Sequence, residues 1–172
     1  FSFNSPHGAC TECTGLGFKL ELDPDLVVPN KEISLAEGAV MPWARAGTSS
    51  PWYASLLESL GQAHSFSTKV PVRELPQEAL DLILYGNQRQ SITMRHRTHH
   101  GRVFTWETTF EGVIPNLGRR HRETSSDYVR SEIERYMASR PCLTCKGDRL
   151  KPDSLAVTVC GKNISQVTRM SI

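Results

Sequence analysis

The sequence has no long hydrophobic run. None of its apolar stretches approaches the roughly 18–20 residues that a membrane-spanning helix needs, and its first residues do not resemble a secretory signal. We therefore expect neither a membrane protein nor a secreted one. The chain starts at Phe1 without an initiator methionine, and we expect it to be a segment of a longer protein.

Motifs of nucleotide binding and catalysis are also missing. The sequence contains no G-x-x-x-x-G-K-[ST] phosphate loop, no G-x-G-x-x-G after a strand, and no Ser/His/Asp spacing typical of a hydrolase. We therefore expect no enzyme activity within these residues. The chain has 172 residues, of which 38% are apolar and 22% charged, and this is enough for one compact domain with a hydrophobic core.

Positive charge is concentrated in one segment. The whole chain carries a formal net charge of only +2, but residues 86–122 contain seven arginines and two glutamates. Residues 1–85 contain five basic and ten acidic side chains. A basic segment beside an acidic one is typical of a surface that binds a polyanion, and nucleic acid is the commonest such partner. A solvated basic face without a partner is the alternative.

Four of the five cysteines form two C-x-x-C pairs, Cys10 with Cys13 and Cys142 with Cys145. Two such pairs supply four thiolates, which complete the tetrahedral shell that zinc prefers. We predict one structural Zn²⁺ held by all four. Separate metals, a redox-active pair and free buried thiols are the alternatives. The fifth, Cys160, follows a strand-like run, and we expect it in the core.

The two cysteine pairs are far apart in the sequence. Between Cys13 and Cys142 lie 128 residues, against the 15–20 of an ordinary zinc ribbon. Because the entropy of loop closure grows only with the logarithm of length, a folded domain can be inserted there. The odd cysteine count and the missing signal peptide indicate a reducing compartment.

Hydrophobic periodicity predicts a mixed α+β fold with a small antiparallel sheet and about three helices. We expect strands at 18–21, 26–28 and 155–160, helices starting near Pro51 and Pro76 and one over 129–137, and loops at 29–51. Residues 92–97 and 104–110 alternate between apolar and polar, which predicts a hairpin closed by a turn at 98–101. We expect Trp43, Trp52 and Trp106 to be core or interface anchors rather than stacking platforms for bases.

The basic segment predicts a DNA-binding surface that is largely independent of sequence. Alternate residues of a strand share a face, so Arg95 and Arg97 should lie opposite the apolar side chains of the hairpin. The cluster after Gly118 is expected in a turn. Local ion pairs of Arg119 and Arg120 with Glu123 and Asp127 are the alternative role for that cluster. The candidate DNA-binding residues are Arg95, Arg97, Arg102, Arg119, Arg120 and Arg122.

Several blocks of the sequence resemble the UvrA family, the damage-sensing ATPase subunit of bacterial nucleotide excision repair. The blocks are Phe1–Gly17 with the first cysteine pair, Phe110–Thr124, Cys142–Pro152 with the second pair, and Gly161–Ile164. They follow the family's order over the whole chain. Thr11 and Leu143 depart from the family's pattern, which commonly has proline after the first cysteine of each pair.

The resemblance implies a zinc module interrupted by a DNA-binding insertion. Residues 1–18 and 140–172 would be the two halves of the module, within the signature domain, and residues 19–139 the insertion. It also implies that ATP is bound only by other parts of the longer protein, which would be a cytoplasmic, bacterial homodimer that works with the helicase partner UvrB. The fragment itself would contribute non-catalytically to damage recognition.

Two other classes stay open at this point. The pattern C-x-x-C-x-G-x-G at Cys10–Gly17 also matches the zinc repeat of DnaJ-type chaperones, which bind unfolded polypeptide. That family repeats the motif four times at short spacing, unlike this chain. A free-standing zinc-ribbon interaction module is the third possibility.

Overall fold

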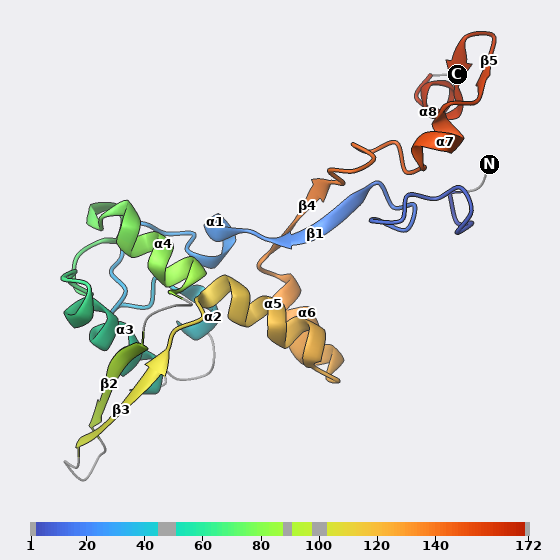
Figure 1. Cartoon of the computed structure of the whole chain (residues 1–172). Helices are drawn as coiled ribbons and strands as arrows, with labels where there is room; N and C mark the ends of the chain where they lie inside the picture. Colours follow the sequence, from blue (N-terminus) through green and yellow to red (C-terminus); the bar gives the residue numbers. More distant parts are fainter. Residues whose placement is uncertain (1–2, 45–50, 88–90, 98–102, 171–172) are drawn as a thin grey trace. The chain divides into compact units, whose positions relative to one another are not determined.

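The computed structural model describes residues 3–44, 51–87, 91–97 and 103–170, without the side chains of Pro51 and Arg95–Arg97. The chain divides into two compact units, one of Phe1–Glu21 with Ala138–Ile172 and one of Leu22–Met137 (Figure 1). Helices and small antiparallel sheets make up both units, which confirms the predicted α+β class. None of the helices in the described ranges has the length and apolarity that crossing a bilayer requires.

Two helices of the larger unit start and end close to where the sequence predicts. Helix α3 (Pro51–Ala63) buries Leu56, Leu57 and Leu60 along one face. Helix α4 (Gln77–Tyr85) follows the short 3₁₀ helix η1 (Val72–Glu74) and ends at Gly86, whose φ of 80° is in the left-handed region that favours glycine. The proposed cap of α3, Ser50, lies outside the described residues.

The predicted hairpin is present. Strand β2 (Ser91–Arg97) pairs antiparallel with β3 (Val103–Thr109), in a register that runs from Ser91 opposite Thr109 to Arg97 opposite Val103. Helix α3 packs against β2, where Ile92 and Met94 are buried. The predicted turn at 98–101 and the neighbouring Arg102 lie outside the described residues.

The sequence predicts core or interface anchors at three tryptophans, and the structure confirms a core position for one of them. Trp43, in the short helix α2 (Met41–Ala44), is buried and stacks on Tyr53 with ring centroids 4.5 Å apart. Trp52 and Trp106 are exposed. Helix α3 packs against β2 and leaves most of β3 exposed. The apolar side chains that alternate with polar ones along β3 are therefore not buried.

The strand expected at 26–28 is wrong, because this segment forms helix α1 (Pro24–Val27). The side chain of Asp23 accepts a hydrogen bond from the Asp25 backbone N–H at 2.9 Å, and Pro24 occupies the first turn. Both features favour a helix start. A local cap therefore outweighs the strand propensity of Val27 and Val28.

The turn expected around Arg119–Arg122 is also wrong. These residues lie in helix α5 (Val113–Glu123), which buries Val113 and Leu117. Its N-cap, Gly112, has φ of 89°, and a Cβ there would lie 2.3 Å from the backbone of Tyr85. The backbone at Gly112 thus approaches the end of α4 closely, immediately before α5 begins.

The third predicted helix is shorter than expected. Helix α6 (Asp127–Glu134) is capped by Ser126, whose side chain accepts from the Val129 N–H at 3.4 Å. Tyr136 lies after the helix, and Met137 begins strand β4 (Met137–Pro141). Strand β4 pairs with β1 (Phe18–Leu22), which is the strand predicted near residues 18–21.

The C-terminal segment corrects the strand expected at 155–160. Helix α7 (Pro152–Leu155) comes first, and strand β5 (Thr158–Val159) is only two residues long and pairs with β6 (Lys162–Asn163). Helix α8 (Ile164–Thr168) follows, capped by Asn163. Cys160 is exposed in the turn between β5 and β6, with φ of 51°, so its predicted place in the core is wrong.

Candidate functional site

The four paired cysteines come together in one buried cluster, although 132 residues separate equivalent members. All four Sγ atoms lie within 4.8 Å of one another. The Sγ atoms of Cys10 and Cys142 are 4.0 Å apart, and those of Cys13 and Cys145 are 3.6 Å apart. Zinc–sulfur bonds of about 2.3 Å in a tetrahedron place neighbouring sulfurs roughly 3.8 Å apart. The cluster therefore has the size and donor set of a metal site.

The two cysteine turns have the same backbone conformation. After the second cysteine of each pair, two residues adopt positive φ: Thr14 at 49° and Gly15 at 84°, and Lys146 at 51° and Gly147 at 94°. In each turn the N–H three residues after the second cysteine donates to that cysteine's carbonyl, at 2.9 Å from Leu16 to Cys13 and at 2.8 Å from Asp148 to Cys145. The glycines permit this tight turn.

Backbone amides favour the thiolate form at some of the sulfurs. Hydrogen bonding to the Cys145 backbone N–H, and then to that of Thr144, lowers the pKa of the Cys142 thiol to about 7 despite burial. Burial raises the pKa of the Cys145 thiol to about 11. Four neighbouring thiolates repel one another, so some of the thiols keep their protons in the absence of a cation. A cation that binds between the sulfurs offsets this repulsion and displaces the remaining protons.

The arginines of α5 fall into two groups. Arg119 is held by two carboxylates, since its guanidinium lies 2.7 Å from Glu111 and 3.0 Å from Glu123. These contacts raise the pKa of Arg119, and the hydrogen bond from Arg119 lowers the pKa of Glu111. Arg120 and Arg122 are exposed, and within the described ranges neither forms an ion pair.

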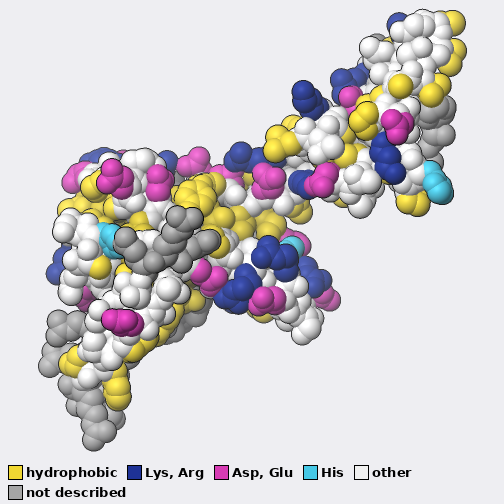
Figure 2. All heavy atoms as spheres, viewed as in Figure 1, with side chains coloured by type: hydrophobic (Ala, Val, Ile, Leu, Met, Phe, Trp, Pro, Cys, Tyr) yellow, Lys and Arg dark blue, Asp and Glu magenta, His cyan; other side chains and the backbone are white. Residues whose placement is uncertain are grey.

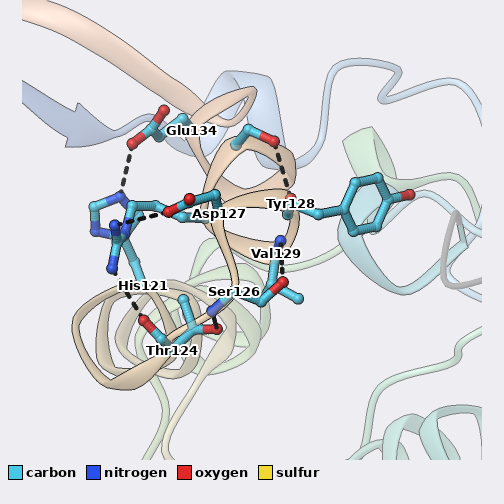
Figure 3. A network of polar contacts seen from close by, with 9 residues as sticks. His121, Thr124, Ser126, Asp127, Tyr128, Val129 and Glu134 are labelled. Atoms are coloured by element: carbon cyan, nitrogen blue, oxygen red, sulfur yellow. Dashed lines mark hydrogen bonds and ion pairs between the residues drawn. The ribbon is translucent and has the colours of Figure 1, made fainter.

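Helices α5 and α6 are joined by polar contacts that fix their junction (Figure 3). His121 Nε2 lies 3.1 Å from a carboxylate oxygen of Glu134, which links the two helices directly. The guanidinium of Arg130 donates to the Thr124 carbonyl at 3.0 Å and lies 3.4 Å from Asp127. Arginine side chains, with acidic side chains among them, lie over α5 and α6 in the space-filling view (Figure 2).

The structure places part of the predicted basic set. Arg119, Arg120 and Arg122 share one helix, and Arg95 and Arg97 occupy alternate positions of β2. The side chains of Arg95 and Arg97, and the whole of Arg102, lie outside the described residues. The sequence analysis missed Glu111 as a partner of Arg119. To predict this pair from the sequence, one would have to recognise helix α5 and the path of the segment that leads into its N-terminus, where Glu111 lies.

A sequence model described as the UvrA DNA-binding domain matches residues 23–135. The chain belongs to this family. The UvrABC system protein A of Bacillus subtilis is 46% identical over 172 residues, which are 100% of this chain and 18% of that protein. The protein of the same name from Mesorhizobium japonicum is 48% identical and is covered to 17% of its length.

A solved structure has a similar fold. UvrA2 from Deinococcus radiodurans superimposes with a TM-score of 0.73 at 28% sequence identity, over 98% of this chain and 21% of that one. These matches confirm the resemblance to UvrA and do not favour the DnaJ-type alternative. The chain spans less than a fifth of the length of the curated relatives named above.

Proposed function

We propose that this chain is the non-catalytic, DNA-binding segment of a UvrA-type excision-repair protein. The observation that carries the proposal is the family match over residues 23–135, since this range includes all six candidate arginines. In this proposal residues 19–139 form the DNA-binding insertion and contribute to damage recognition. Residues 1–18 and 140–172 form the two halves of a zinc module.

The contact with DNA is proposed to be made mainly to phosphates. Guanidinium groups bind phosphate oxygens through paired hydrogen bonds, and such contacts carry little sequence information. Arg120 and Arg122 are available for this role because no carboxylate among the described residues neutralises them. Arg119 already has two carboxylate partners, Glu111 before α5 and Glu123 at its end. We therefore assign it mainly the role of holding α5 to the segment that contains Glu111, and only secondarily a contact with DNA. Arg95, Arg97 and Arg102 of the hairpin complete the proposed surface.

The metal is proposed to be a single Zn²⁺ bound by Cys10, Cys13, Cys142 and Cys145. Four buried thiols with sulfur separations of 3.6 and 4.0 Å suit zinc, which accepts tetrahedral sulfur ligation. Its role would be structural. When bound, the ion would link the segment before the insertion, which supplies Cys10 and Cys13, to the segment after it, which supplies Cys142 and Cys145.

The longer protein is proposed to supply the remaining activities. By family membership, ATP hydrolysis, the contact with UvrB and a homodimeric assembly belong to segments beyond these residues. The UvrA relatives also support a bacterial cytoplasmic location, where reduced thiols remain available for zinc.

The test is the salt dependence of DNA binding by the complete chain. We expect modest affinity for duplex DNA that is indifferent to sequence and falls steeply with salt, with a log–log slope of about 0.9 per phosphate neutralised. The double variant Arg120→Gln/Arg122→Gln should reduce this slope by roughly two. Arg135→Gln is the matched control, because it removes an exposed charge just after α6 that is paired with Glu132 at 3.2 Å. No salt-dependent binding, or equal effects of both variants, would contradict the proposal.

A further inference from the structure

The two cysteine turns differ at one equivalent position, which Gly17 occupies after the first turn and Arg149 after the second. Each residue lies four positions after the second cysteine of its pair, and both have positive φ, 84° at Gly17 and 71° at Arg149. The Gly17 N–H donates to the Cys13 sulfur at 3.2 Å. The Arg149 N–H likewise donates to the Cys145 sulfur. The backbone therefore has the same role in both turns, but only the second turn carries a side chain at this position.

A positive φ is a strained conformation for an arginine. Glycine adopts it freely, whereas a Cβ creates a steric conflict with the backbone, so Arg149 carries a strain that Gly17 does not. A strained residue of this kind persists only where the contacts around it hold it in place. The contacts of the Arg149 side chain are therefore a candidate for a function that glycine could not supply.

The Arg149 side chain reaches across to the first cysteine turn. Its Nε–H donates to the Gly15 carbonyl at 2.7 Å, and its guanidinium carbon lies 4.3 Å from the centroid of the Phe3 ring. Its methylene chain lies over Gly17 so closely that a Cβ at Gly17 would be 2.8 Å from the Arg149 Cγ. One side chain of the second turn thus contacts the first turn, the residue after that turn and the N-terminal segment.

The main chain of Arg149 links the two cysteine pairs as well. Its carbonyl accepts from the Cys10 N–H at 2.9 Å, while its N–H is bound to the Cys145 sulfur. The carbonyl of Gly17 accepts in the same way from the Cys142 N–H, also at 2.9 Å. The backbone bonds are therefore matched between the two turns, and the contacts of the guanidinium are an addition that has no counterpart at Gly17.

We propose that Arg149 is the positioning residue of the cysteine cluster and sets how tightly the cluster holds its metal. The inference rests on the proposed zinc module and adds to it a residue that is not a ligand. Hydrogen bonds around a metal site keep its ligands oriented, and the loss of one typically lowers metal affinity by roughly 10- to 100-fold. By joining the two turns, the Arg149 side chain would hold the four sulfurs at the separations that zinc requires.

The test replaces Arg149 with glycine, the residue at the equivalent position of the first turn. Arg149→Gly removes the side chain, keeps the backbone N–H and carbonyl, and relieves the strain of the positive φ. If the side chain had no role, this variant would hold zinc as tightly as the unaltered chain or more tightly. We expect instead that its zinc affinity falls by roughly 10- to 100-fold, as measured on the complete chain by competition with a chromophoric chelator.

A second variant separates geometry from charge. Arg149→Lys keeps the charge and most of the methylene chain but lacks the planar guanidinium and its Nε–H. Because Arg149 is exposed, solvent weakens any attraction between its charge and the thiolates, so lysine should not restore the affinity. Lys162→Gln is the matched control for charge. It removes an exposed cation on β6, whose amino group contacts Met170 at 3.5 Å, and should leave the zinc affinity unchanged.

Two further measurements distinguish a role at the cluster from general destabilisation. The absorption spectrum of bound Co²⁺ reports coordination geometry, and saturated Arg149→Gly should still give the spectrum of a tetrahedral sulfur site. All three tryptophans lie in the larger unit, so their fluorescence follows the unfolding of that unit by urea. With chelator present, this transition should have the same midpoint in Arg149→Gly and in the unaltered chain.

The outcomes separate the alternatives. An unchanged or higher zinc affinity of Arg149→Gly would overturn the inference, and so would an equal loss in Lys162→Gln. Full affinity of Arg149→Lys would also overturn it, since charge alone would then be sufficient. A lower urea midpoint of Arg149→Gly in chelator would indicate general destabilisation, with the same consequence. Absence of bound metal in the unaltered chain would instead contradict the proposed zinc module itself.

Discussion

The backbone N–H of Cys10 donates to the carbonyl of Arg149 at 2.9 Å, and the equivalent bond runs from Cys142 to Gly17, also at 2.9 Å. Each bond joins the first cysteine of one turn to the residue seven positions after the first cysteine of the other. The two turns are therefore related by an approximate twofold arrangement, although 132 residues separate equivalent positions. The two reciprocal backbone hydrogen bonds hold the turns side by side, so that the four cysteine sulfurs form one cluster.

Metal binding should follow from this arrangement. We expect one zinc per chain, and Cys142→Ser should release it because three thiolates no longer complete the shell. The ends of the insertion should loosen while its own core stays partly folded. Elemental analysis and proteolysis at the segment ends would measure both effects. Cys160→Ser is the control, since Cys160 is exposed and outside the cluster, and it should keep its zinc. A stoichiometry of zero or two would contradict the prediction.

The two glycines of the cysteine turns should differ in their tolerance of alanine. Both have positive φ, so each alanine costs on the order of 1 kcal/mol in backbone strain. A Cβ at Gly15 would also lie 1.8 Å from the Phe3 carbonyl oxygen, whereas a Cβ at Gly147 meets nothing within 4 Å. Gly15→Ala should therefore lower the free energy of unfolding by clearly more than Gly147→Ala. Urea unfolding of the zinc-loaded chain measures this, and equal effects would refute it.

The Glu111–Arg119 pair should make the larger unit sensitive to acid. Arg119 lowers the pKa of Glu111 from its ordinary value of 4.5, so the folded state holds the carboxylate charged where the unfolded state protonates it. The stabilisation is present above that ordinary value and is lost as the pH falls through the lower pKa of the folded state. Since the Glu111 side chain is 39% exposed, we expect a few tenths to about 1 kcal/mol.

Glu111→Gln tests this pH dependence. The variant should be less stable than the unaltered chain at pH 7, and the difference should shrink at low pH as the unaltered chain loses its ion pair. Urea unfolding over a pH series measures the difference. Glu58→Gln serves as the control, because Glu58 is exposed on α3 and no ion pair of it is found within the described ranges. A constant difference at all pH values would show that the ion pair does not contribute.

The hairpin arginines should contribute to DNA affinity through charge. Arg95→Gln/Arg97→Gln should lower the salt slope by about one per lost phosphate contact and leave the zinc content unchanged. Alternate strand positions place both residues on one face of β2, opposite the face of Met94. Titrations at several salt concentrations measure the slope. If it is unchanged, the hairpin face does not bind phosphate.

The sequence by itself was sufficient to predict those features that depend on local signals. Helices α3 and α4 have proline near the start and repeated apolar residues on one face, and α4 ends at Gly86. The hairpin has alternating residues in both strands. The spacing within each C-x-x-C pair likewise indicates metal binding, because both thiols come from a single turn.

Only the tertiary structure decided the features that depend on distant neighbours. Helix α5 contains Pro115 and Gly118 and begins where Gly112 approaches the end of α4 closely, a contact between segments that are distant in the sequence. That helix then separates Arg119, which meets Glu111 and Glu123, from Arg120 and Arg122, which meet no carboxylate in the described ranges. Trp106 is exposed because α3 packs on β2 and leaves this position of β3 in contact with solvent. Burial and ion pairing depend on which segments pack together, and such packing is fixed by the whole fold rather than by the order of residues in one segment.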